Sequence, residues 1–116
     1  MSEANTDALT QLYDEADSLK MAGDLDGAVG KLNEALELDP GYTLAHSALA
    51  VILQRQGKHD EAITHAEKVT ELAPEDPFSF TAMSVTYQRA YAGTNDQAYI
   101  QKAEDAMEKS RILSQR

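Results

Sequence analysis

The sequence predicts an all-α fold, an α-solenoid of three antiparallel helix pairs. The first observation is an internal repeat: the stretch 43–76, shifted by 34 residues toward the N-terminus, superimposes like residues. The superimposed pairs are Leu53 and Leu19, Ala50 and Ala16, Gly57 and Gly23, Ala62 and Ala28, Leu72 and Leu38, and Pro74 and Pro40. The second observation is the opposite shift, which aligns Val51, Gln54 and Arg55 with Val85, Gln88 and Arg89. A period of this length is typical of stacked helix pairs.

The first helix is predicted over residues 7–22, because its apolar residues recur every three or four positions and share one helical face. They are Leu9, Leu12, Ala16 and Leu19. We expect Asn5 or Thr6 to cap the start of this helix by accepting a backbone N–H bond, with residues 1–5 frayed. Gly23 is expected to end the helix, since glycine adopts a left-handed turn without steric cost.

The second helix is expected to follow directly. Asp24 or Asp26 caps its start, and it reaches about Leu38. Pro40 stops it, because the residue before a proline is pushed out of helical geometry.

The next three helices follow the same pattern. The third is predicted over residues 42–56, and Gly57 turns the chain into a fourth over residues 60–73, with Asp60 at its start. Pro77 suits the first turn of the fifth helix, where a missing N–H costs nothing, and that helix reaches about Tyr91.

The third pair is expected to be longer than the others. Equivalent alanines lie 34 residues apart at Ala28 and Ala62 but 41 apart at Ala62 and Ala103, so about seven residues are inserted within 91–100. Seven residues make about two helical turns, so the last helix keeps its phase. We expect a longer hairpin with its tip at Gly93–Asp96, either as a loop extension alone or as a point of contact with a partner.

The two end helices are predicted to be polar on their outer sides. One face of the last helix carries Tyr99, Ile100, Ala103, Ala106, Met107, Ser110 and Leu113, and the rest carries Gln101, Lys102, Glu104, Asp105, Glu108, Lys109 and Arg111. Glu15 stands where the inner copies have Leu49 and Met83, a charge that is tolerated if no repeat precedes it. Because solenoids need polar terminal units, we expect a complete small protein.

The repeated residues also fit a known pattern of bulky, apolar, small and bulky positions followed by alanine, a bulky group and proline. The central copy reads His46, Leu49, Ala50, Leu53, Ala62, Ala66, Pro74; the first reads Leu12, Glu15, Ala16, Leu19, Ala28, Leu32, Pro40; the third reads Phe80, Met83, Ser84, Tyr87, Ala103, Met107. On these residues the chain resembles the tetratricopeptide repeat family over about residues 6–113. The resemblance implies a right-handed superhelix and a single domain, 1–116, with repeats over about 9–42, 43–76 and 77–113.

In the family that the chain resembles, the first helix of each pair lines a concave groove. Carried over to this sequence, the resemblance gives a peptide-binding groove of Tyr13, Asp17, Leu44, Ser47, Val51, Gln54, Arg55, Phe78, Thr81, Val85, Gln88 and Arg89. Stacking is expected to place Arg55 beside Arg89 and Gln54 beside Gln88. Amides can bond a peptide backbone and guanidinium groups a carboxylate. The alternative is that both arginines form exposed ion pairs worth little energy.

One specialisation of the family is not expected. Its chaperone-binding members hold a C-terminal carboxylate with lysine, asparagine and arginine side chains. The equivalent positions here are Tyr13, Asp17, Val51, Thr81 and Val85, and none matches. The groove therefore favours an apolar or mixed segment, either extended or an amphipathic helix.

The three histidines do not form a metal-ligand pattern. His46 occupies a bulky interior position, so we expect a packed core imidazole. His59 and His65 are six residues apart and do not share a helical face as a two-histidine ligand pair does. No catalytic residue, metal or cofactor is expected, since the sequence has no glycine-rich phosphate loop, nucleophile elbow or Ser, His, Asp arrangement.

Composition narrows the class of partner. Twenty acidic and ten basic residues give a net charge of −10, which disfavours nucleic acid, whose binding depends on basic contacts. No apolar run reaches the length of a membrane span, so no direct membrane insertion is expected. The absence of cysteine and of an export signal favours a cytoplasmic protein.

The sequence thus predicts a non-enzymatic adaptor that binds a peptide or helix of another protein in its concave groove. The alternative is a self-assembling scaffold that pairs through its end helices or its extended third hairpin, where Tyr91 and Tyr99 lie. We expect a monomer, with a homodimer as the alternative.

Overall fold

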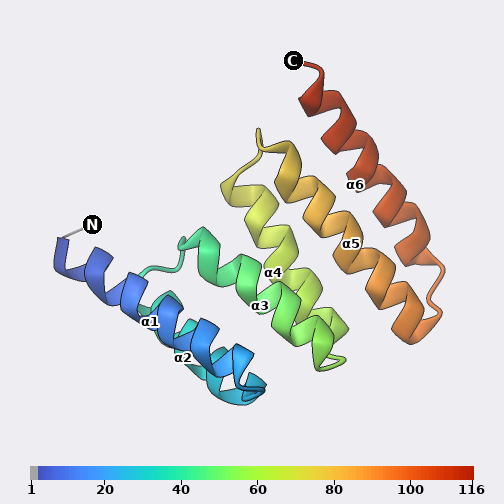
Figure 1. The fold of residues 1–116 in the computed structure, drawn as a ribbon. Helices are drawn as coiled ribbons and strands as arrows, with labels where there is room; N and C mark the ends of the chain where they lie inside the picture. Colours follow the sequence, from blue (N-terminus) through green and yellow to red (C-terminus); the bar gives the residue numbers. More distant parts are fainter. Residues whose placement is uncertain (1–2) are drawn as a thin grey trace.

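A computed structural model describes residues 3–116 of the chain (Figure 1). These residues form six α-helices and no strand, which confirms the predicted all-α class. The helices are α1 (Glu3–Met21), α2 (Leu25–Leu38), α3 (Thr43–Arg55), α4 (His59–Leu72), α5 (Pro77–Thr94) and α6 (Ala98–Ser114). Consecutive helices pack as antiparallel pairs, and the three pairs lie side by side in chain order, with the two ends of the chain at opposite ends of the row (Figure 1). This is the expected α-solenoid, about 41 × 33 × 20 Å.

The turns within the first two pairs follow the sequence signals. Gly23 and Gly57 adopt φ angles of 88° and 79°, a left-handed conformation that side chains disfavour. Asp24, rather than Asp26, caps α2, and its carboxylate accepts the backbone N–H of Gly27 at 2.9 Å. Helix α4 begins one residue earlier than predicted, so Asp60 lies in its first turn, where a carboxylate suits the positive end of the helix dipole.

The start of α1 corrects the sequence prediction. Asn5 and Thr6 lie inside the helix instead of capping it, and the backbone carbonyl of Thr6 accepts a hydrogen bond from the Thr10 hydroxyl at 3.1 Å. Residues 3–5 belong to α1. Residues 1 and 2 lie outside the described residues.

The insertion in the third pair mostly lengthens its helices. Helix α5 continues three residues past the predicted end at Tyr91, and Asn95 closes it in the left-handed conformation with φ 62°. The tip of the hairpin lies at 95–97, so Gly93 is helical and not part of the tip. A Cβ atom at Gly93 would collide with the imidazole of His59 in α4 unless that ring moved.

Two clusters of buried residues hold the pairs together. The larger spans α1 to α4 and consists of Leu9, Ala16, Ala28, Leu32, Ala35, Ala45, Leu49, Ile52, Leu53 and Ala62. The smaller joins α4 to the third pair through Ile63, Tyr87, Ala90 and Ala103. Eight of the repeated residues are in these clusters, among them Leu49, Ala62 and Tyr87, so these repeated positions serve packing.

The outer sides of the end helices follow the prediction only in part. Glu15 is half-buried, pairs with Lys31 of α2 at 3.2 Å and accepts a bond from Gln11; these contacts lower the pKa of its carboxyl group. The polar residues predicted for α6 are all exposed. However, Ile100 and Met107 are also exposed, which corrects their assignment to the buried face of α6. They line a cleft between α5 and α6.

Candidate functional site

A cleft of about 330 Å³ lies between α3 and α5, and α4 forms its floor. We call it the inner cleft. It is lined by Ser47, Ala50, Val51 and Gln54 of α3, Ala66 and Val69 of α4, and Ser79, Ala82, Met83, Val85, Thr86 and Arg89 of α5. Five of the predicted groove residues are therefore brought together here: Ser47, Val51, Gln54, Val85 and Arg89.

The inner cleft combines a buried floor with exposed apolar walls. Ala50, Ala66 and Val69 are buried, while Val51 and Val85 keep 52% and 40% of their surface exposed. A single exposed valine is ordinary, but two facing valines beside a cleft form a patch that another apolar group can cover.

Polar groups border this apolar surface. Gln54 and Arg89 line the inner cleft and Arg55 is exposed beside Gln54 in the sequence. Neither arginine forms an ion pair with any carboxylate among the described residues, so the alternative that they serve exposed ion pairs is not supported. Their guanidinium groups are free to bind an acidic group of a ligand.

Several predicted groove residues lie elsewhere. Tyr13 and Asp17 line a separate small hollow between α1 and α3, where Asp17 pairs with Lys20 at 3.4 Å. The hydroxyl of Thr81 lies 2.7 Å from that of Ser110 in α6, so Thr81 contributes to the packing of α5 on α6.

The predicted ladder of glutamines is not formed as expected. Gln88 donates a hydrogen bond to the Ser84 hydroxyl at 3.2 Å and lines a different cleft, between α5 and α6. Leu44, Arg55 and Phe78 are exposed but do not belong to the lining of the inner cleft. The predicted groove residues thus come from α1, α3 and α5 and line more than one hollow.

Sequence reasoning also missed part of the wall. Ser79, Ala82 and Thr86 were not assigned to the groove, and Met83 was assigned to the interior. These residues line the inner cleft because α3 and α5 contact each other only lightly, while α5 packs mainly on α6 and also on α4. A signal was available, since Ser79, Ala82, Met83 and Thr86 share one helical face through their spacing of three and four.

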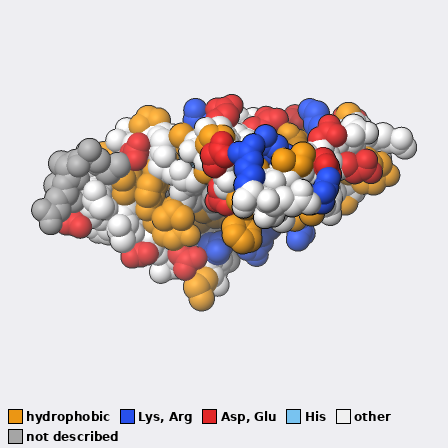
Figure 2. Space-filling view, turned by 90° about the horizontal axis from the view of Figure 1, so that it is seen from above, with side chains coloured by type: hydrophobic (Ala, Val, Ile, Leu, Met, Phe, Trp, Pro, Cys, Tyr) orange, Lys and Arg blue, Asp and Glu red, His pale blue; other side chains and the backbone are white. Residues whose placement is uncertain are grey.

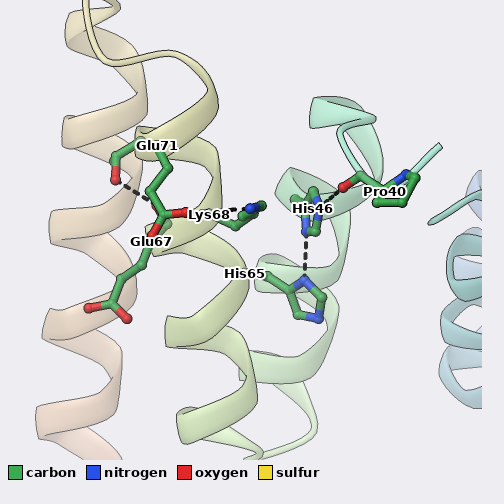
Figure 3. A network of polar contacts seen from close by, with 7 residues as sticks. Pro40, His46, His65, Glu67, Lys68 and Glu71 are labelled. Atoms are coloured by element: carbon green, nitrogen blue, oxygen red, sulfur yellow. Dashed lines mark hydrogen bonds and ion pairs between the residues drawn. The ribbon is translucent and has the colours of Figure 1, made fainter.

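The histidines form a contact that the sequence did not predict (Figure 3). His46 is buried, as expected, and its Nε2 lies 2.8 Å from the Pro40 carbonyl oxygen. Since that oxygen can only accept, Nε2 carries the proton, and Nδ1 of His46 accepts from Nδ1 of His65 at 2.9 Å. Burial, reinforced by the nearby imidazole of His46, lowers the pKa of His65.

The described residues contain no cluster of three or more His, Asp or Glu side chains arranged to hold a metal ion. None of the helices of residues 3–116 is both long and apolar enough to span a bilayer. On the face seen in Figure 2, basic side chains form short, separated groups with acidic side chains between them. This face therefore carries no continuous basic stripe.

The architecture defines a class: three stacked antiparallel helix pairs make an α-solenoid, and such repeats present extended surfaces to other molecules. A family model described as tetratricopeptide repeat matches residues 19–79, more than half of the chain. The chain belongs to the tetratricopeptide repeat family, and it has the all-α fold of a protein-interaction module. Among curated protein sequences, none matches this chain.

Solved structures with a similar fold include proteins named MamA. A crystal structure of MamA superimposes with a TM-score of 0.78 at 19% identity, over 92% of this chain and 58% of that chain. MamA from residue 41 to its end, from Desulfovibrio magneticus RS-1, has a TM-score of 0.72 at 26% identity, over 90% of this chain and 55% of that chain. Our chain thus spans little more than half the length of these structures, and the likeness concerns the fold.

Proposed function

We propose that this protein is an adaptor that binds a segment of another protein in the inner cleft. The segment presents an apolar side chain to Val51 and Val85 and an acidic group to Arg89 and Arg55. In this proposal residues 1–116 act as a single domain in the cytoplasm, as a monomer and without catalytic activity, cofactor or metal.

The observation that carries the proposal is the composition of the inner cleft. Val51 and Val85 face solvent from neighbouring helices, although neither is needed to pack the repeats. Arg89 lines the same cleft without an ionic partner among the described residues, in a chain with a net charge of −10. Unpaired basic groups are scarce on such a surface, and their position beside apolar residues fits a ligand with both kinds of group.

The competing function, self-assembly through the third hairpin, has less support. Tyr99, one of the aromatic residues on which that hypothesis rests, stacks on Tyr87 within the third pair, and its hydroxyl donates to Asp60 of α4 at 3.3 Å. This ring is therefore committed to internal packing. Light scattering after size exclusion tests the point: we expect a monomer at micromolar concentrations, and a stable dimer would favour self-assembly.

The proposal is tested with the double variant Arg55→Glu and Arg89→Glu. We expect loss of partner capture from a native lysate with unchanged circular dichroism, because both side chains are exposed and lack ion pairs in the described residues. A matched control, Lys58→Glu with Lys109→Glu, makes the same change in net charge outside the inner cleft and should retain capture. Equal capture by both double variants and the wild type would refute the assignment of the inner cleft.

A further inference from the structure

A second and larger cleft, of about 750 Å³, lies between α5 and α6. We call it the end cleft. Its lining includes Ser84 and Gln88 of α5 and Met107 and Ser110 of α6. In Figure 1, α6 forms the outer edge of the row, and Met107 of this helix is exposed.

Several residues that line the end cleft are equivalent to residues that line the inner cleft, one helix pair earlier in the chain. A shift of 34 residues carries Ala50 onto Ser84 and Gln54 onto Gln88, and a shift of 41 carries Ala66 onto Met107 and Val69 onto Ser110. All four residues of each set line their cleft. Ala66 is only 5% exposed, whereas Met107 is 45% exposed. The end cleft is therefore the place that a further helix would occupy.

Helix α5 shows how a helix occupies such a place. It runs antiparallel along α4, so that Tyr87 donates to Glu67 at 2.8 Å and packs on Ile63. Further along, the Thr70 hydroxyl lies 3.9 Å from the sulfur of Met83. An occupant of the end cleft is thus expected to be a helix with small and apolar residues on its contacting face, as α5 has.

The charges of the end cleft define the occupant more closely. Under the same shift, Ile63 becomes Glu104 and Glu67 becomes Glu108. Arg111 bonds Glu108, with its Nε 3.0 Å from the carboxylate, but Glu104 has no ion pair among the described residues. A helix lying along α6 must therefore bring a basic residue to Glu104 where α5 brings apolar groups to Ile63.

A second copy of the chain does not meet these requirements. Stacked head to tail, it would offer α1, in which Leu19 and Ala22 take the places of Tyr87 and Ala90. It would therefore bring no basic residue to Glu104, and both copies carry a net charge of −10. Like charges in contact oppose such an interface.

We propose that the end cleft binds an amphipathic helix of a partner protein, with apolar residues against Met107 and Ile100 and a lysine or arginine facing Glu104. This surface is separate from the inner cleft, so the protein can hold two segments at once and join them. Binding at the end cleft does not depend on the proposed role of Arg55 and Arg89.

The probe for this proposal is a stapled, fluorescent peptide with the sequence of residues 77–94 and the substitution Ala90→Lys, which places a cation opposite Glu104. Fluorescence anisotropy with the full chain should give saturable binding in the micromolar range. Met107→Glu should weaken binding by roughly tenfold or more, because it places a charge on the apolar contact. Val51→Glu, in the inner cleft, is the matched control and should leave binding unchanged.

Exchanging the charges of peptide residue 90 and protein residue 104 distinguishes specific binding from nonspecific binding. A peptide with Ala90→Glu should bind the wild type poorly and regain affinity for the Glu104→Lys protein. Absence of saturable binding, equal weakening by Val51→Glu, or no recovery in the charge exchange would each refute the proposal. Formation of a dimer by the protein alone that blocks the peptide would also refute it, since a second copy would then be the occupant.

Discussion

The second and third helix pairs carry the same pattern of residues but differ in what covers them. In the second pair, α5 packs on α4, and Ala66 is buried. In the third pair, the equivalent Met107 lies in the open end cleft, although methionine is the more apolar and larger residue. At this repeated position, the residue of the pair that is followed by another pair is buried, and the residue of the last pair is exposed.

The second and third pairs also differ in the turn that joins their two helices. The second pair uses Gly57 and a short turn, while the third uses Asn95 and longer helices. The extra turns of α5 and α6 keep the same packing, as Ser84 donates to the Ala103 carbonyl at 2.8 Å across the pair. A repeat can thus be lengthened without losing its contacts, provided that the insertion preserves helical phase.

The largest difference in the free energy of unfolding is expected when the equivalent residues Leu49 and Met83 are each replaced by alanine. Leu49 is fully buried, so Leu49→Ala should lower the free energy of unfolding by about 2–5 kcal/mol. Met83 is only partly buried at the wall of the inner cleft, so Met83→Ala should cost clearly less. Urea unfolding monitored by circular dichroism measures both, and equal losses would contradict the unequal burial.

A smaller change in stability is expected from substitutions in the turns within the second and third pairs, at Gly57 and Asn95. Gly57 has φ 79° and nothing within 4 Å of an added Cβ atom, so Gly57→Ala should cost about 1–2 kcal/mol through backbone conformation alone. Asn95 already tolerates a positive φ, and Asn95→Gly should leave thermal stability nearly unchanged. If Gly57→Ala leaves the thermal midpoint unchanged, the left-handed turn after α3 is wrong.

The smallest predicted effect is the pH dependence of the histidine contact in the second pair, which the third pair lacks. Because burial lowers the pKa of His65, the unfolded chain binds a proton more readily than the folded one. This contribution to stability is complete above the unfolded-state pKa of about 6.5 and is lost as the pH falls below it. Urea titrations at several pH values should show a shallower decline for His65→Gln than for the wild type. His59→Gln serves as the control, and identical slopes for both variants would exclude a role for His65.

Most of the fold could be predicted from the sequence because the repeat encodes it. Gly23, Gly57 and Pro77 mark helix ends through backbone conformation, which is local, and the buried alanines recur at a fixed period. The extension of α5 beyond Tyr91 was not predicted, because a glycine by its type favours a turn, whereas Gly93 lies within the helix.

The candidate site was less predictable from the sequence because the residues that line it depend on how neighbouring helices pack. A helical face could be assigned from spacing, and Val51, Val85 and Arg89 of that face line the inner cleft. Whether Thr81 and Gln88 face a groove or an adjacent helix depends on how α6 packs, and both bond within the third pair. The contact between His46 and His65 likewise joins two helices and leaves no sequence signal.

The central claim is that α5 covers the second helix pair, whereas the third pair is left open. The reactivity of single cysteines tests this claim most directly. The chain has no cysteine, so Ala66→Cys and Met107→Cys each give one reporter at equivalent positions. We predict that Met107→Cys reacts with a maleimide at least roughly tenfold faster, because Ala66→Cys reacts only when the packing of α5 on α4 opens. Equal rates in two natively folded variants would contradict the stacking on which both proposed binding surfaces depend.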